Sequence, residues 1–168
     1  ALLSRKGVLA VPRPLRALVG LGVKRARPGA AGWKAAELLQ LPAWDVAHTY
    51  PLSRLTFSDG ELRKLLSVDL RPDAVAMEVK QLLGEREDLH LGTLSQVSVA
   101  ELSTYLPDVL LRDTDQMSMS HALEVRVPFL DHHLTDFVLG VPDAIKYPHT
   151  PKKLLTDALG DLLPREVT

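Results

Sequence analysis

Cysteine is absent from this chain of 168 residues. Disulfide bonds, thiolate metal sites and cysteine nucleophiles are therefore excluded. Long apolar runs are also missing, because charged or polar residues interrupt every leucine-rich stretch before it reaches the roughly 20 residues of a membrane helix. The sequence therefore predicts no membrane span, and its lack of cysteine is compatible with an intracellular protein.

Residues that favour β-strands are scarce. Isoleucine occurs once, at Ile145, and aromatic residues make up 5% of the chain, whereas leucine dominates the apolar residues. Apolar spacing, capping signals and prolines predict a mainly helical chain. The expected helices span 16–27, 33–41, the leucine-rich residues after a capping box at 58–61, 72–83, the residues from Ser95 or Ser98 to Pro107, 108–123, 131–139 and 151–159. The helix at 72–83 has its apolar residues on one side, Ser95 or Ser98 is the expected cap of the next helix, and Asp131 that of the helix at 131–139. Pro107 either ends one helix or begins the following one.

Acidic residues are absent from the first 36 positions. These positions carry eight basic residues, Arg5, Lys6, Arg13, Arg16, Lys24, Arg25, Arg27 and Lys34, which leaves 12 basic and 21 acidic residues for the rest of the chain. Such an opening is compatible with a mitochondrial targeting segment, a nucleic-acid patch or a membrane-surface helix. We favour a solvated basic face over a nucleic-acid patch, because no aromatic side chain in the first 32 residues could stack on bases. Since residues 1–36 and 37–168 carry opposite net charge, we also expect the basic segment to dock against the acidic remainder or a missing domain. We expect no specific nucleic-acid binding and no membrane binding.

The most informative stretch runs from Asp113 to Asp131. On a helix, Asp115 shares a face with small and apolar neighbours, which would leave its carboxylate partly desolvated and in need of a partner. Glu124 and Arg126 alternate with valines just before a proline, so both charges point to the same side of an extended segment. We expect them to pair in a partly buried setting, either as a cross-link that pins the loop or as the charged wall of a ligand site.

Six histidines raise the alternative of a metal-dependent hydrolase. His121 and Glu124 stand three residues apart, and the neighbours His132 and His133 follow closely. Adjacent side chains on a helix point about 100° apart, so these two neighbours are not expected to face one ion. No His-Glu-x-x-His pattern occurs, and we expect no metal site.

Two lysines, Lys152 and Lys153, occupy the expected first turn of the last helix, just after Pro151. The helix dipole makes cations unfavourable at this end, so a nearby anion would explain one lysine and simple solvation the other. Lys152 is the better functional candidate.

Four segments, in this order and spacing, resemble the synthetase domain of glutamine-hydrolysing asparagine synthetase. They are Tyr105-Leu106-Pro107-Asp108, Asp115-x-x-Ser118-Met119, Glu124-x-Arg126-x-Pro128-Phe129-Leu130-Asp131 and Lys152-x-Leu154-Leu155. The third segment is the most specific. The resemblance is strong over residues 101–166 and weak before them, where Tyr50, Arg54, Phe57 and the helix after Ser58 look like the family's variable helical region.

The resemblance implies both a fold and a reaction. The family's synthetase domain is an α/β domain of the adenine-nucleotide alpha-hydrolase-like type, also called PP-loop ATP pyrophosphatase, and this chain would be its helical C-terminal portion. Residues 1–94 would form the variable helical region with the basic N-terminal segment, and residues 95–168 the C-terminal helical part. The family's enzymes are ATP-dependent ligases that use Mg²⁺, adenylate the aspartate side chain with release of pyrophosphate, and let glutamine-derived ammonia displace AMP to give asparagine.

Other parts of such an enzyme have no counterpart in this sequence. The family's Ser-Gly-Gly-x-Asp-Ser nucleotide loop and its Gly-Asp-Glu segment do not occur, and the glutaminase domain would need a cysteine nucleophile. Both ends of the chain look cut from something longer. We therefore expect a fragment of a cytoplasmic enzyme, inactive alone and without tightly bound ATP or Mg²⁺. Its partners would be the glutaminase domain and the nucleotide-binding half of the synthetase domain.

The resemblance also implies roles for single residues. Lys152 matches the family lysine that contacts the reacting phosphate and the intermediate, which implies a catalytic role. Asp115 matches a carboxylate of the site, and Glu124 and Arg126 match the charged pair that lines it, so these three are implied to bind substrate.

Two departures from the family pattern keep alternatives open. Gln116 stands where the family usually has arginine, and Thr156 stands where arginine usually follows Lys-x-Leu-Leu. Two cations are thus missing from an anionic site. This is compatible with a changed acceptor, as in amidotransferase relatives that modify sugars or peptides, or with a drifted paralogue. A non-catalytic helical module that presents its basic N-terminal region to an acidic partner is the other alternative.

Overall fold

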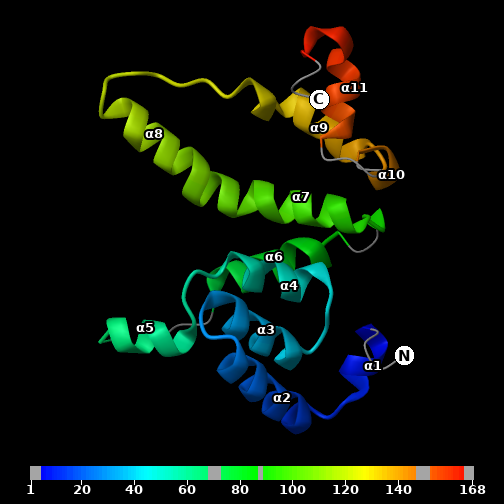
Figure 1. Cartoon of the computed structure of the whole chain (residues 1–168). Helices are drawn as coiled ribbons and strands as arrows, with labels where there is room; N and C mark the ends of the chain where they lie inside the picture. Colours follow the sequence, from blue (N-terminus) through cyan, green and yellow to red (C-terminus); the bar gives the residue numbers. More distant parts are fainter. Residues whose placement is uncertain (1–4, 68–72, 87–88, 147–151, 165–168) are drawn as a thin grey trace.

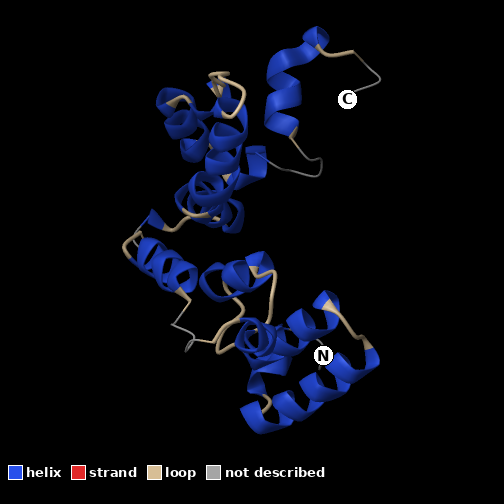
Figure 2. Cartoon of the chain, turned by 90° about the vertical axis from the view of Figure 1, so that its left-hand side faces the viewer, coloured by secondary structure: helices blue, strands red, loops and turns tan. Residues whose placement is uncertain are grey.

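The computed structural model describes residues 5–67, 73–86, 89–146 and 152–164. These residues form helices and loops with no strand among them, which confirms the predicted mainly helical fold (Figure 2). The α-helices are α1 (Arg5–Ala10), α2 (Arg13–Ala26), α3 (Ala30–Gln40), α4 (Val46–Arg54), α5 (Asp59–Leu65), α6 (Ala74–Gly84), α7 (Thr93–Ser103), α8 (Arg112–Met119), α9 (His132–Gly140), α10 (Asp143–Lys146) and α11 (Lys153–Leu159). The chain also forms a π-helix, η2 (Leu106–Leu111), and the 3-10 turns η3 (Pro128–Leu130) and η4 (Gly160–Leu162). No helix in the described ranges is long and apolar enough to cross a membrane.

Helices α2 and α3 pack against each other as a close hairpin at the N-terminal end of the molecule (Figure 1). The guanidinium of Arg16 on α2 is buried, and its Nη1 donates to the carbonyls of Leu39 and Leu41 at 2.8 and 3.0 Å. These carbonyls lie at the C-terminal end of α3, where the helix dipole favours a cation. The prediction of a solvated basic face is therefore wrong for Arg16.

Lys34 shows the same kind of attachment. Its Nζ donates to the carbonyl of Ser53, near the end of α4, at 2.7 Å. Arg16 and Lys34 thus bind main-chain carbonyls at the C-terminal ends of helices. The expected partners of these two residues were acidic side chains.

Helices α4, α6 and α7 enclose the main apolar core. Its members are Val46, Tyr50, Val79 and Ala100, with Val75, Leu83 and Val97 packed against them. The contribution of α6 confirms its predicted apolar face, because residues spaced by four positions lie on one side of a helix.

Two predicted helix starts are confirmed. Ser58 forms the expected capping box, since its side chain accepts from the N–H of Glu61 while the Glu61 carboxylate accepts from the N–H of Ser58. Asp131 caps α9 by accepting from the N–H groups of His133 and Leu134. Such caps use neighbours in sequence, which is why the pattern of residues is sufficient to find them.

Helices α7 and α8 lie almost end to end and form the long rod of the molecule (Figure 1). Helix α7 ends at Ser103, and Pro107 stands in the first turn of the π-helix η2, which confirms the alternative that this proline begins a second helix. Proline has no N–H to donate, but the N–H groups in the first turn of a helix have no partner within that helix, so proline is well tolerated there. Helix α8 ends at Met119, before the predicted end near residue 123, and Ala122 beyond it has a positive φ of 55°.

Residues 120–127 run back from the end of α8 toward α9 without regular structure (yellow in Figure 1). This return places α9, α10 and α11 beside α7 and away from the α2–α3 hairpin (Figures 1 and 2). Two of the segments that carry the family resemblance, at 128–131 and 152–155, thus lie close to each other and to α7.

Candidate functional site

A cavity of about 640 Å³ lies between α7, α9 and α11. Its wall is mainly apolar and includes Phe129 and Leu130 of the most specific sequence motif. Two lysines, Lys146 and Lys152, also line it. An apolar cavity with a few converging charged groups is the usual form of a ligand site, and this one is our candidate.

Lys152 stands immediately before α11, as its N-cap, with φ and ψ of 60° and 19°. It is exposed. We predicted that it would lie in the first helical turn after Pro151, which is outside the described residues, but the helix begins one residue later at Lys153. A left-handed backbone conformation is unfavourable for a lysine and persists only where the surroundings hold it.

Lys153 forms an ion pair within its own helix. Its Nζ contacts both carboxylate oxygens of Asp157, one turn further on, at 2.7 and 2.6 Å. This exposed pair accounts for Lys153 as a solvated helix residue. The structure therefore separates the two lysines, with Lys152 at the cavity and Lys153 in a local ion pair.

The carboxylate of Asp143 caps α7 from a distance of 48 positions in the sequence. It accepts from the N–H of Leu94 at 2.8 Å and from the N–H and Oγ of Ser95 at 3.1 and 2.5 Å. The prediction that Ser95 or Ser98 caps this helix is thus wrong. Gly92 precedes α7 and leaves room for this cap, because a Cβ at that position would collide with the Asp143 carboxylate.

The pKa of Asp143 lies below its ordinary value. Burial raises this pKa, but the hydrogen bonds from Ser95 Oγ and from the N–H groups of Leu94 and Ser95 outweigh burial, and the Lys146 ammonium adds to their effect. Asp143 is therefore an anion at neutral pH and is stabilised by the N-terminal end of α7.

Lys146 is 8% exposed, and its Nζ is bound in the interior. It donates to Ser95 Oγ at 2.9 Å and to the carbonyl of Leu139 near the end of α9 at 3.0 Å. Ser95 Oγ in turn donates to Asp143, so these three side chains form one connected group, which we call the α7–α10 cluster. Sequence reasoning missed this cluster, because its members come from segments far apart in the chain.

Glu124 and Arg126 form the predicted ion pair, with Arg126 Nη2 2.7 Å from Glu124 Oε1. The expected partial burial is wrong, since the two side chains are 71% and 85% exposed. They lie in the irregular segment that follows α8, which no other described element covers closely enough to desolvate them.

Asp115 is also exposed, contrary to the expectation that apolar neighbours would desolvate its carboxylate. It lies on α8, and it is not among the described residues that line the cavity. The same holds for Glu124 and Arg126. Of the four predicted site residues, the structure thus brings Lys152 alone to the cavity.

The histidines require one correction. The rings of His132 and His133 were expected to diverge, but their centroids lie 3.8 Å apart at the start of α9. In the part of the chain that the structure describes, no three His, Asp or Glu residues are placed to hold a metal ion together.

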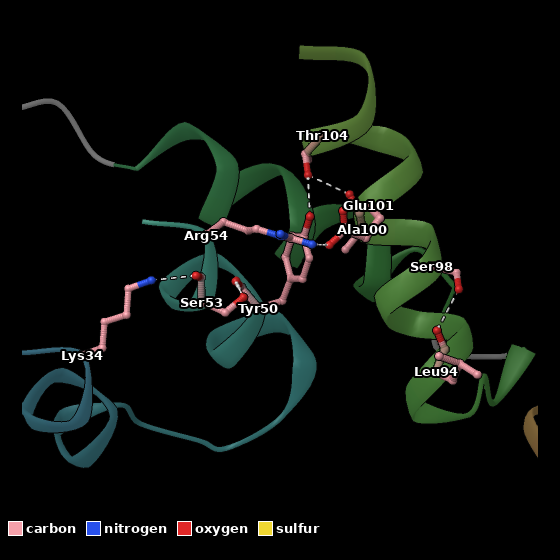
Figure 3. A network of polar contacts seen from close by, with 9 residues as sticks. All are labelled: Lys34, Tyr50, Ser53, Arg54, Leu94, Ser98, Ala100, Glu101 and Thr104. Atoms are coloured by element: carbon pink, nitrogen blue, oxygen red, sulfur yellow. Dashed lines mark hydrogen bonds and ion pairs between the residues drawn. The ribbon is translucent and has the colours of Figure 1, made fainter. Parts of the chain in front are cut away.

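A second polar network joins α4 to the junction of α7 and η2 (Figure 3). Arg54 forms an ion pair with Glu101, and its guanidinium lies 4.3 Å from the centre of the Tyr105 ring. Nearby, the hydroxyl of Tyr50 lies 3.2 Å from Thr104 Oγ1. This network connects the N-terminal half of the chain to the helix that forms one wall of the cavity.

The sequence profile of the family described as asparagine synthase matches residues 10–168. The chain belongs to the asparagine synthase family. The match extends beyond the strong resemblance at 101–166, so the earlier helices are part of the asparagine synthase pattern as well.

Individual relatives agree with this membership. A protein of Mycobacterium tuberculosis (strain H37Rv), assigned as a glutamine-hydrolysing asparagine synthetase, is 28% identical over 158 residues, which cover 94% of this chain and 24% of the relative. The asparagine synthetase of Gallus gallus is 42% identical over 67 residues, 38% of this chain and 12% of the relative. Amidase chry2 of Gibberella zeae is 42% identical over 52 residues, 30% of this chain and 8% of the relative. No solved structure matches the chain significantly.

The chain thus spans about a quarter of the length of the mycobacterial relative. The phosphate loop that the resemblance implies for a nucleotide site does not occur in the sequence, and the cations among the described residues that line the cavity are Lys146 and Lys152.

Proposed function

We propose that this chain is part of an ATP-dependent amide ligase of the asparagine synthetase type. Family membership over residues 10–168 and the named mycobacterial and avian relatives support the proposal. In the complete protein, the side-chain carboxylate of aspartate is adenylated by ATP with Mg²⁺, pyrophosphate leaves, and ammonia from glutamine displaces AMP to give asparagine. The chain alone is inactive in this proposal, because the nucleotide-binding half and the glutaminase domain belong to the rest of the protein.

The placement of Lys152 is the observation that carries the proposal. It lies at a cavity whose wall includes Phe129 and Leu130, so two separate segments of the family pattern meet there. Adenylation builds negative charge on the transferred phosphoryl group, and a fixed cation lowers the barrier when it meets that charge in the transition state. We assign this role to Lys152.

Asp115, Glu124 and Arg126 keep their proposed role in substrate binding. Their exposure supports an assignment to the boundary with the missing half of the synthetase domain, because exposed charges remain free to meet partners there. In the same proposal, residues 1–94 form the variable helical region with the basic N-terminal segment, and residues 95–168 form the C-terminal helical part of the synthetase domain.

A second candidate is an amidotransferase of the same family with a different acceptor. The similarity to amidase chry2 favours it, as do the two missing cations. Gln116 is exposed on α8, and Thr156 donates to the carbonyl of Lys153 within α11, so neither supplies positive charge. An assay of pyrophosphate release with aspartate and with other carboxylate acceptors separates the two candidates.

The experiment that tests the proposed function uses the longer parent protein. Lys152→Ala should lower ATP-dependent amide formation by about 10² to 10³, which is typical for one lost electrostatic contact in a transition state, while glutamine hydrolysis continues. Lys153→Ala is the matched control and should have little effect. Full ligase activity in Lys152→Ala would refute the assignment.

A further inference from the structure

The proposed function assigns no role to the buried ammonium of Lys146. It is held by two fixed acceptors, Ser95 Oγ at 2.9 Å and the Leu139 carbonyl at 3.0 Å. Burial of a lysine is unfavourable unless hydrogen bonds and an opposite charge compensate for lost water. Asp143 provides that charge on the other side of Ser95.

The α7–α10 cluster complements two helix dipoles at once. Asp143 accepts three hydrogen bonds at the N-terminal end of α7, where negative charge is favourable. Lys146 donates to a carbonyl near the C-terminal end of α9, where positive charge is favourable. The cluster therefore fixes α7, α9 and α10 relative to one another.

The α7–α10 cluster and Lys152 share the candidate cavity, which Lys146 of the cluster lines. Lys146 and Lys152 line one cavity, and α10 contacts α11, the helix that Lys152 precedes. Lys152 has the left-handed backbone conformation that its surroundings must hold in place. We propose that Ser95, Asp143 and Lys146 position Lys152, and that Lys146 acts on the ligase reaction through Lys152; this inference rests on the proposed function.

Lys146 is a positioning residue in this proposal and touches no reacting atom. Its ammonium is already bound by Ser95 and Leu139, whereas Lys152 is exposed at the cavity. A displacement of about 1 Å in a catalytic group can lower a rate by about 10²-fold. Loss of Lys146 should therefore lower the kcat of the ligase reaction more than it changes the KM for the acceptor.

A double-mutant cycle in the parent protein tests the proposal. Lys146→Met, Lys152→Ala and the double variant are compared for ligase kcat and KM, with glutamine hydrolysis and thermal melting measured in parallel. We expect Lys146→Met to lower kcat about 10-fold or more when Lys152 is present and to have no further effect when Lys152 is already alanine. Lys146→Arg should restore part of the loss, and Lys153→Met serves as the control for removal of a nearby cation.

Equal losses in the two backgrounds would overturn the proposal, because Lys146 would then act independently of Lys152. If Lys146→Met does not fold, Ser95→Ala replaces it in the same cycle, since it removes one of the two acceptors of Lys146 but keeps the main-chain bonds to Asp143. Failure of the proposed function looks different: Lys152→Ala alone would then keep full activity.

Discussion

The hydroxyl of Tyr50 donates to Thr104 Oγ1 across the junction of α4 and α7 (Figure 3). The direction follows from the partners, because Thr104 Oγ1 uses its single hydrogen toward the carbonyl of Ala100 at 2.7 Å. Both residues are buried, so an unpaired hydroxyl here would lack solvent as a substitute.

Thr104→Val should therefore destabilise the chain by about 1–3 kcal/mol, since it leaves the buried Tyr50 hydroxyl without its acceptor. Tyr50→Phe should cost about 1 kcal/mol, because Thr104 keeps its bond to Ala100. Thr114→Val is the matched control: its Oγ1 makes the same kind of bond to a carbonyl four residues back, but it is exposed. Denaturant unfolding measures all three, and equal losses in Thr104→Val and Thr114→Val would contradict the argument.

Gly92 should not tolerate a larger residue. Gly92→Ala places a methyl group against the Asp143 carboxylate and should displace the cap of α7, at a cost of about 1–3 kcal/mol. Gly84→Ala is the control, since no atom lies within 4 Å of a Cβ there, and it should be neutral or slightly stabilising. Thermal melts compare the two; a Gly92→Ala protein as stable as Gly84→Ala would show that Asp143 does not need this space.

Hydrogen bonds between neighbours in sequence could be predicted from the sequence, whereas those between distant residues could not. The caps by Ser58 and Asp131 were predicted because donor and acceptor lie within three positions of each other. The cap by Asp143 was not, because it acts on α7 from 48 positions away and only the folded chain brings the two together. For the same reason, the group of basic residues without acidic neighbours predicted a solvated basic face but not the burial of Arg16.

In the candidate site, too, a contact between near neighbours could be predicted from the sequence, whereas burial could not. Residue types and order were sufficient to single out Lys152 and to indicate that Glu124 pairs with Arg126. Burial could not be predicted for that pair, because it depends on which elements cover residues 120–127 and not on the alternation of charges with valines. The α7–α10 cluster carried no sequence signal, since a lysine such as Lys146 near the end of a short helix is usually solvated.

Acid should weaken the fold partly through Asp143. Its pKa is lowered in the folded chain, so the folded state binds fewer protons than the unfolded state near this pKa, and stability falls as protons are added. The contribution is present above pH of about 4 and is lost as the pH falls through the lowered pKa. Unfolding of wild type and Asp143→Asn between about pH 2 and pH 6 tests this: the two curves should converge at the acid end.

Glu61→Gln is the control for that pH profile. Hydrogen bonds from the Ser58 side chain and main chain lower the pKa of Glu61 in the same direction, but this carboxylate is fully exposed. It should therefore change the acid limb much less than Asp143→Asn. A larger effect from Glu61→Gln would place the acid sensitivity in α5 and not in the α7–α10 cluster.

The ion pair between Glu124 and Arg126 should contribute little to the stability of this chain. Both side chains are more than two-thirds exposed, at 71% and 85%, and exposed pairs typically contribute about 0–1 kcal/mol because water and salt screen them. Glu124→Gln, Arg126→Gln and the double variant should each unfold within about 1 kcal/mol of the wild type, with a coupling that shrinks as salt is added. Losses of about 3–5 kcal/mol in the single variants, relieved in the double variant, would instead be the behaviour of a buried pair. Equilibrium unfolding at low and high salt decides between these outcomes, because only a solvated pair responds strongly to ionic strength.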